Sequence, residues 1–236
     1  MISATPKSAY RAGVSDGVPF IVMVIPFAIL FGVVAVEAGL TLAQTMGFTV
    51  LVIAGAAQFA ALQLMVEDAA IGFVLLAALA VNLRMAMYSA ALVPYLGKAT
   101  FWQRAVVGYL NFDQTYMTSV AKYEDTPDMS VPDRVAYFLG VATPIAPLWG
   151  LTTLVGALIG KSIPESVAID FILPIAFLSM VAPMLRSLAH VAAALVSVGV
   201  ALALAGLPSG AGLLIAAVCA MFTGVVVETW MERART

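Results

Sequence analysis

Long apolar runs follow one another along almost the whole chain of 236 residues. A helix that crosses a membrane needs about 20 predominantly apolar residues. Eight runs approach that length, at residues 18–36, 42–66, 69–94, 105–120, 135–159, 167–185, 188–207 and 210–227. They predict an all-α polytopic membrane protein with eight transmembrane segments, or with seven if one of the segments is re-entrant.

The length and composition suit one membrane-embedded bundle. We expect residues 1–236 to form a single integral membrane domain, with 1–16 as a cytoplasmic lead-in and 121–134 as a hydrophilic loop between two halves. Only 10% of the residues are charged, whereas a soluble domain has about 25%. The net charge of −2 provides no basic face for nucleic acid. Cys219 is the single cysteine, and neither a metal nor a cofactor is expected.

The third run contains an arginine where apolar residues would be expected. Arg84 and Tyr88 are four residues apart and share one face of a helix, whereas Asn82 points about 200° away from Arg84. An arginine near the centre of a bilayer costs roughly 2.5–3.5 kcal/mol on insertion scales. Arg84 therefore either faces a bundle interior or cavity, or lies near a membrane surface and extends its charge to the headgroups.

The fourth run contains the second embedded charge. Asp113 shares a helical face with Tyr116, and Gln114 follows it directly. An embedded aspartate is a candidate proton carrier, although a pair with Arg84 could equally serve only to lock two helices together. In the second run, the amide of Gln58 also needs a partner. The candidate substrate-binding or coupling residues are Gln58, Asn82, Arg84, Tyr88, Asp113, Gln114 and Tyr116.

Prolines mark places where the helices could be interrupted. The candidate helix breaks are Pro19, Pro26, Pro144 and Pro147. The segment from Gly17 to Pro26 resembles the segment from Gly140 to Pro147, which indicates a possible internal repeat. Transporters often bind substrate where interrupted helices expose backbone groups. Proline and glycine are, however, generally frequent in membrane helices.

The distribution of lysine and arginine predicts the orientation of the chain. With eight crossings and a cytoplasmic N-terminus, seven of these residues fall inside, namely Lys7, Arg11, Lys122, Arg134, Arg186, Arg233 and Arg235. Three fall outside, namely Lys98, Arg104 and Lys161. Because cytoplasmic loops carry the excess of positive charge, we expect the N-terminus to be cytoplasmic.

Several short motifs together carry a resemblance to a known family. They are Gly17-Val18-Pro19, Pro26-Phe27, Phe31-Gly32, Ala54-Gly55-Ala56-Ala57-Gln58-Phe59, Val81-Asn82-Leu83-Arg84, Tyr88-Ser89-Ala90, Pro94 and Asp113-Gln114-Thr115-Tyr116. The chain resembles the AzlC family, the large subunit of two-component exporters of branched-chain amino acids. Two positions depart from the family pattern, which usually has His where this chain has Met85 and Glu where it has Gln114.

The resemblance implies a function, a partner and a location in the bacterial plasma (inner) membrane. It implies gradient-driven export of leucine, isoleucine or valine, with methionine as a close relative, together with a small AzlD-type membrane subunit. Formation of a higher oligomer is compatible with this arrangement. The alternative function is a membrane scaffold or assembly subunit that transports nothing. An enzyme is not expected, because the chain contains neither a His-Glu-x-x-His motif nor a nucleotide-binding loop of the Walker type.

Overall fold

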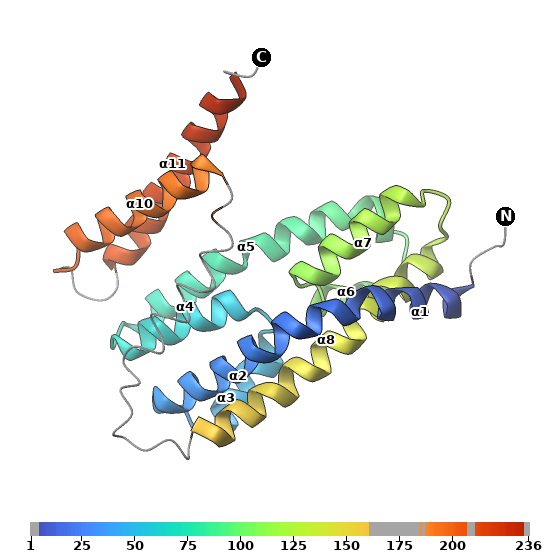
Figure 1. Ribbon diagram of the computed structural model, residues 1–236, viewed down its shortest axis with the longest axis horizontal. Coiled ribbons are helices and arrows are strands. Elements are labelled where there is room, and N and C mark those ends of the chain that lie inside the picture. Colours follow the sequence, from blue (N-terminus) through green and yellow to red (C-terminus); the bar gives the residue numbers. More distant parts are fainter. Residues whose placement is uncertain (1–4, 161–184, 186, 207–210, 234–236) are drawn as a thin grey trace. The chain divides into compact units, whose positions relative to one another are not determined.

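The computed structural model describes residues 5–160, 185, 187–206 and 211–233 of the chain. Every regular element within these residues is helical, which confirms the all-α class. The predicted sixth run lies outside the described residues, except for Leu185. Each of the other predicted runs contains described helices (Figure 1).

Among the described residues, pairs of short helices lie between longer helical segments. Their bounds are α1 (Pro6–Gly17), the 3-10 turn η1 (Val18–Phe20), α2 (Ile21–Glu37), α3 (Leu42–Leu51), α4 (Gly55–Val66), α5 (Ile71–Leu96), α6 (Phe101–Tyr109), α7 (Asp113–Asp125), α8 (Val131–Gly160), α10 (Leu188–Ala203) and α11 (Ala211–Arg233). Within the described residues, the segments long and apolar enough to cross a membrane are Pro6–Glu37, Ile71–Leu96, Val131–Gly160 and Ile215–Arg233.

The second and fourth predicted runs do not form single long helices. The run 42–66 is divided into α3 and α4 by residues 52–54, and the run 105–120 falls within α6 and α7, which residues 110–112 separate. Each of these helices is shorter than the roughly 20 residues that a crossing requires. Neither run therefore forms one continuous helix, and a re-entrant segment is one of the alternatives that the sequence predicts.

Helices α6 and α7 form a hairpin that returns to the end from which it starts. Three residues of α7 pair in order with three of α5: Asp113 with Arg84, Tyr116 with Tyr88, and Tyr123 with Tyr95. Because the residue numbers rise together, α7 runs parallel to α5, and α6, which joins the end of α5 to the start of α7, runs back in the opposite direction (Figure 1). We call this element hairpin 101–125.

Because this hairpin reverses, two positive charges lie at a different end of the bundle from the one predicted. Lys98 and Arg104 were predicted on the opposite side of the membrane from Lys122. Since hairpin 101–125 starts and finishes at the same end of the bundle, all three residues lie at that end. The predicted separation is wrong because a hydropathy pattern does not distinguish a crossing from a reversal.

Helices α3 and α4 form a second hairpin, which we call hairpin 42–66. The amide of Gln58 donates a hydrogen bond to the hydroxyl of Thr49 at 3.3 Å. In a continuous helix, residues nine apart would be separated by about 13 Å along the axis. In addition, Phe48 from α3 and Phe59 from α4 both pack against Phe31 of α2. The chain therefore reverses between α3 and α4.

The two hairpins begin near opposite ends of α8. Near the start of α8, the Arg134 guanidinium lies 5.5 Å from the centre of the Tyr95 ring, shortly before hairpin 101–125 begins. Near the end of α8, a Cβ at Gly160 would lie 3.1 Å from the Cα of Val33, shortly before hairpin 42–66 begins. The ends of α3 and α6 meet, because the Tyr109 hydroxyl donates a hydrogen bond to the carbonyl of Val50 at 2.5 Å.

Matching caps start the first helix of each hairpin. The hydroxyl of Thr41 accepts from the backbone N–H of Gln44, whose side chain accepts from the N–H of Thr41. Thr100 and Gln103 repeat this arrangement at the start of α6. Such reciprocal caps satisfy two backbone donors that a helix start leaves unpaired, and a capping residue contributes about 1 kcal/mol.

The prolines lie inside helices that continue through them. Pro26 lies within α2, and Pro144 and Pro147 lie within α8. The prediction that these three residues break a helix is wrong. Membrane helices tolerate interior prolines when neighbouring helices and local adjustments compensate for the lost hydrogen bond. Pro19 differs, because it lies in the turn η1 that joins α1 to α2.

Helices α1 and α2 run parallel to α8 in close backbone contact. A Cβ at Gly17 would lie 2.6 Å from the carbonyl oxygen of Val141, and one at Gly32 would lie 2.6 Å from the backbone nitrogen of Ala157. Glycines permit this approach because they have no side chain. The two segments of the predicted internal repeat therefore lie side by side in the same direction, and the repeat itself stays a prediction.

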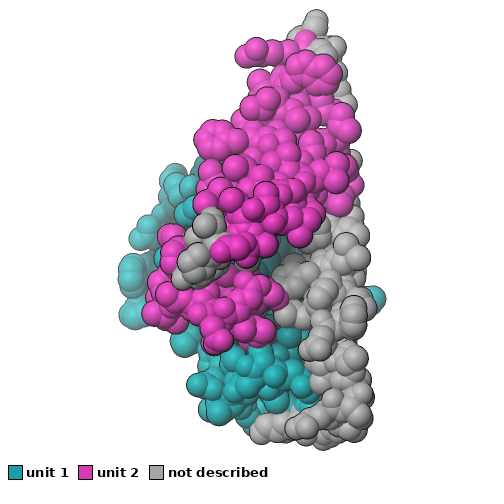
Figure 2. Space-filling model, turned by 90° about the vertical axis from the view of Figure 1, so that its left-hand side faces the viewer, with its two compact units in different colours: residues 1–59, 79–163 teal, residues 60–78, 164–236 magenta. Residues whose placement is uncertain are grey.

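Contacts between Cα atoms divide the chain into two compact units, residues 1–59 with 79–163 and residues 60–78 with 164–236 (Figure 2). The interruptions of both hairpins belong to the first unit. In the second unit α10 and α11 form an antiparallel pair, because a Cβ at Gly212 would lie 3.2 Å from the Cβ of Leu204 and one at Gly224 would lie 3.7 Å from that of Ala193.

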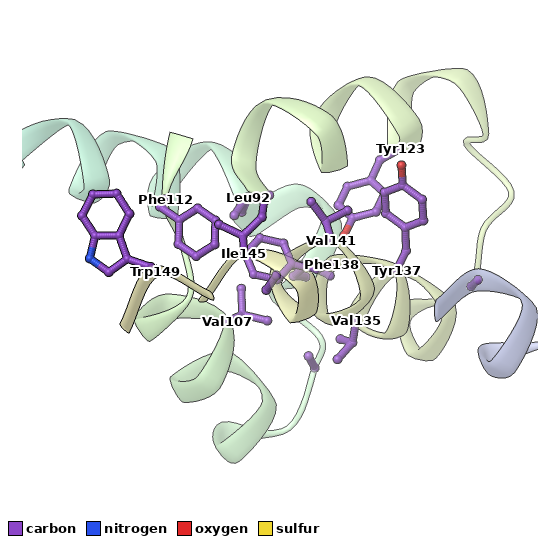
Figure 3. Close-up of a cluster of buried hydrophobic side chains, with 14 of the residues drawn as sticks. Leu92, Val107, Phe112, Tyr123, Val135, Tyr137, Phe138, Val141, Ile145 and Trp149 are labelled. Carbon is purple, nitrogen blue, oxygen red and sulfur yellow. The ribbon is translucent and has the colours of Figure 1, made fainter. Parts of the chain in front are cut away.

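The core of the first unit includes residues of α5, α6, α7 and α8 (Figure 3). Phe138 and Val141 of α8 are fully buried in it. Phe112 joins the same cluster from the interruption between α6 and α7, and it is 5% exposed. Burial of a side chain of this size contributes about 1.5–3 kcal/mol. Phe112 therefore anchors the tip of hairpin 101–125 in the core.

Candidate functional site

An ion pair joins the middle of α5 to the start of α7. Nη1 of Arg84 lies 2.9 Å from Oδ2 of Asp113, and the two side chains are 28% and 35% exposed. Arg84 comes 13 residues after Ile71 and 12 residues before Leu96, the ends of α5. At 1.5 Å per residue it is about 18 Å from the nearer helix end. The predicted pairing is confirmed, and its position in the helix argues against an arginine that reaches the headgroups.

The local sequence determines where Asp113 lies. It is the first residue of α7. The hydroxyl of Thr115 accepts the N–H of Phe112 at 3.0 Å and lies 2.8 Å from the carbonyl of Leu110, which stabilises the turn before the helix. A carboxylate in the first turn also interacts favourably with the helix dipole, by about 0.3–1 kcal/mol. The turn thus presents a negative charge to Arg84 at the tip of hairpin 101–125.

Two tyrosines lie beside the ion pair. The rings of Tyr88 and Tyr116 stack with centroids 4.1 Å apart and an interplanar angle of 9°. The phenol of Tyr88 also interacts electrostatically with the carboxylate of Asp113. Four of the predicted site residues, Arg84, Tyr88, Asp113 and Tyr116, are therefore brought together by the parallel packing of α5 and α7.

Sequence reasoning did not include two further polar residues of this site. The amide nitrogen of Asn111 donates to the hydroxyl of Ser89 at 3.2 Å and lies 3.5 Å from the carbonyl of Met85. Asn111 is 4% exposed. Its position two residues before Asp113, in an otherwise apolar run, is the signal that could have identified it. These contacts hold the tip against the middle of α5.

Some buried polar atoms at the site have no hydrogen-bond partner among the described residues. They are Nε of Arg84, Oδ1 of Asp113 and Oδ1 of Asn111. Buried polar atoms are normally paired in folded proteins. The site therefore offers one positively charged donor and two acceptors, which are the groups that a carboxylate and an ammonium require.

The remaining predicted residues do not join this group through any contact described for the chain. Gln58 is fully buried in hairpin 42–66, where its amide nitrogen bonds to Thr49 and its Oε1 has no partner in the described part of the chain. Asn82 lies on α5, and its Oδ1 is also unpaired. Gln114 is half-buried on α7. The predicted need of Gln58 for a partner is confirmed, whereas its contact with a ligand stays a prediction.

The charges of this site suit recognition of a small molecule that carries both a positive and a negative charge. Asp113 and Arg84 neutralise each other, and among the described residues there is no group of three or more His, Cys, Asp or Glu side chains that could hold a metal ion. A charged ligand can exchange partners with such a pair without leaving either charge isolated in an apolar surrounding. The arrangement is therefore compatible with reversible binding of a small zwitterion.

Comparison with known proteins agrees with a membrane protein of this kind. The family model described as AzlC protein matches residues 19–163. The inner membrane protein YgaZ of Escherichia coli (strain K12) is 23% identical over an alignment that covers 98% of this chain and 97% of the relative. No solved structure matches. The matched family region includes the whole ion-pair site and both hairpins.

Proposed function

The chain belongs to the AzlC family, and we propose that it is the large subunit of a secondary transporter that exports branched-chain amino acids. AzlC-family proteins are membrane transport components, and the chain is a multi-pass membrane protein. The proposed substrates are leucine, isoleucine and valine, with methionine as a close relative. The proposed partner is a small AzlD-type membrane subunit, and the complex is proposed to lie in the bacterial inner membrane.

The ion pair of Arg84 with Asp113 is the observation that carries this proposal. Charged residues inside membrane segments are costly and commonly mark a pathway for substrate or protons. A free amino acid carries the same two charges as the pair. Its carboxylate can bind Arg84 and its ammonium can bind Asp113, since Nε of the arginine and Oδ1 of the aspartate have no partner among the described residues.

Asp113 is also the residue most suited to couple export to a proton gradient. It is the single carboxylate among the candidate site residues, because Gln114 and Met85 replace titratable groups that are usual in the family. Among the candidate site residues, Asp113 is therefore the best suited to carry a proton near neutral pH, because the tyrosine phenol ordinarily has a pKa of about 10. Coupling to the membrane potential alone would not require this residue to change its charge.

The structure supports the proposed cytoplasmic N-terminus through the placement of positive charge. Apart from Arg84, all lysines and arginines of residues 5–160 lie at the end of the bundle where α1 and α8 begin, namely Lys7, Arg11, Lys98, Arg104, Lys122 and Arg134. At the other end of the bundle, α2 ends with the acidic residue Glu37. An excess of positive charge is typical of the cytoplasmic side.

The proposal can be tested by reconstitution with the proposed small AzlD-type subunit. Proteoliposomes loaded with radiolabelled leucine should release it with saturable kinetics when the partner is present, and unlabelled isoleucine or valine should compete. The single subunit should release much less. If the complete complex gives no saturable amino-acid flux although it binds its partner, the scaffold function is favoured and the transport proposal is wrong.

A further inference from the structure

A pocket lies where the ends of α3 and α6 meet α8. It has a volume of about 470 Å³ and is lined by residues of both hairpins, among them Val50, Ile53, Tyr109 and Leu110. Small-molecule sites typically measure about 300–1,000 Å³. All of its lining residues belong to the first compact unit. The pocket is thus large enough for a small organic group and lies at the interruptions of both hairpins.

Most polar side chains of this pocket are already engaged with the protein itself, whereas the indole Nε1 of Trp149 has no hydrogen-bond partner among the described residues. The hydroxyl of Tyr109 donates to the carbonyl of Val50 at 2.5 Å. The hydroxyl of Thr143 accepts from the phenol of Tyr10 at 2.9 Å and donates to the carbonyl of Leu139 at 2.7 Å. The surface left for a ligand is therefore mainly apolar.

The lining also excludes a charged ligand group. Its side chains include Val50, Ile53, Leu110, Ala146 and Trp149, and none of the lining residues is charged. Transfer of an unpaired charge to such surroundings is strongly unfavourable. An aliphatic group gains about 0.8 kcal/mol for each buried methylene. The pocket consequently selects the hydrocarbon end of a molecule and rejects its charged end.

The pocket and the ion-pair site share the tip of hairpin 101–125. Leu110 lines the pocket, and Asp113 follows three residues later. Three residues of extended chain span at most about 11 Å. A displacement of this tip would therefore change both the apolar pocket and the environment of the ion pair.

We propose that this pocket receives the aliphatic side chain of the transported amino acid and sets the side-chain specificity of transport. The proposal rests on the proposed function and extends it, because the Arg84–Asp113 pair recognises only the charges that all amino acids share. The pocket between the two hairpins supplies the discrimination between large and small side chains. Its size and lack of charge favour branched aliphatic side chains over polar ones.

A pocket-filling substitution tests this inference. Ala146→Leu adds an isobutyl side chain to the lining of the pocket without changing a residue of the ion-pair site. Leu151→Phe is the matched control, because Leu151 is on the same helix but is 58% exposed and does not line the pocket. Each variant is reconstituted with the partner subunit, and its folding is verified by size-exclusion chromatography and its melting temperature.

The readout is the ratio of leucine efflux to alanine efflux. Ala146→Leu should lower this ratio at least tenfold, because the loss of space for one or more methylenes typically changes specificity by about 10–200-fold. Leu151→Phe should leave it unchanged. In the opposite direction, Ile53→Ala enlarges the pocket and should improve competition by phenylalanine, which provides an independent test if Ala146→Leu does not fold.

The outcomes separate this inference from the function on which it rests. If the unmodified complex transports no amino acid, the proposed function fails. If it transports leucine but Ala146→Leu and Leu151→Phe have the same leucine-to-alanine ratio, or if a folded Ile53→Ala variant does not change its competition profile, the pocket is a lipid-facing groove and the inference is overturned.

Discussion

Replacement of the two members of the Arg84–Asp113 pair, singly and together, should show what the pair contributes. In Asp113→Leu, Arg84 remains in the middle of α5 without its counter-charge. An uncompensated arginine at a helix centre costs roughly 2.5–3.5 kcal/mol. Because the two side chains are 28% and 35% exposed, part of this cost is offset by solvation. We therefore expect a loss of about 2 kcal/mol in the free energy of unfolding.

The double variant Arg84→Met/Asp113→Leu removes both charges at once. Its free energy of unfolding should return to within about 1 kcal/mol of the unmodified protein, because apolar replacement of an ion pair is often neutral. Unfolding can be measured by titration of detergent-solubilised protein with sodium dodecyl sulfate, followed by circular dichroism. If the single and double variants are equally unstable, the energetic reasoning about this pair is wrong.

Transport by the same variants distinguishes a structural pair from a functional one. The stable double variant should be inactive in the leucine efflux assay, since it has no charge to offer the substrate. Asp113→Asn keeps the shape of the side chain while it removes the charge, and should also lose gradient-driven efflux. Wild-type efflux by a well-folded Asp113→Asn variant would eliminate the proton and ammonium roles of Asp113.

Two further predictions concern the architecture. On a Cys219→Ser background, cysteines placed at Lys98 and Asp125 should react with a membrane-impermeant maleimide from the same side of the membrane, whereas labelling from opposite sides would contradict the re-entrant hairpin 101–125. Gly156→Ala should destabilise the protein by about 1–3 kcal/mol, because its Cβ would overlap a backbone carbonyl of α2. Gly150→Ala is its control, since no atom lies within 4 Å of the Cβ there, and equal melting temperatures for the two variants would contradict the close packing of α2 with α8.

The site residues that the sequence predicted are those whose burial in apolar surroundings costs the most free energy. An arginine and an aspartate, each isolated in an apolar run, need compensation wherever the chain folds. That requirement was sufficient to predict the Arg84–Asp113 pair and the neighbouring Tyr88 and Tyr116. Asn111 was not included because an amide is less costly to bury than a charge, and its partners come from a different helix.

The reversals at residues 52–54 and 110–112 could not be predicted from hydropathy. A run of 25 apolar residues has the same composition whether it crosses a membrane or turns back within it. Neither interruption contains proline or glycine. The first contains Val52 and Ile53, whose branched side chains weaken a helix slightly, and the second is stabilised by the contacts of Asn111 and Thr115. Tertiary contacts of this kind outweigh the preferences of single residues.

The two hairpins resemble each other in construction but differ in chemistry. Each follows a long helix, begins with a Thr–Gln cap, and consists of two short helices separated by three residues. Because they enter from opposite ends of α8, they are arranged like the inverted repeats of many secondary transporters. The second short helix of one begins with Asp113, paired with Arg84, whereas that of the other begins with Gly55, packed against Phe27 and Trp149. One hairpin thus presents a charged tip and the other an apolar tip. The proposed substrate, with a zwitterionic end and a hydrocarbon end, matches this asymmetry.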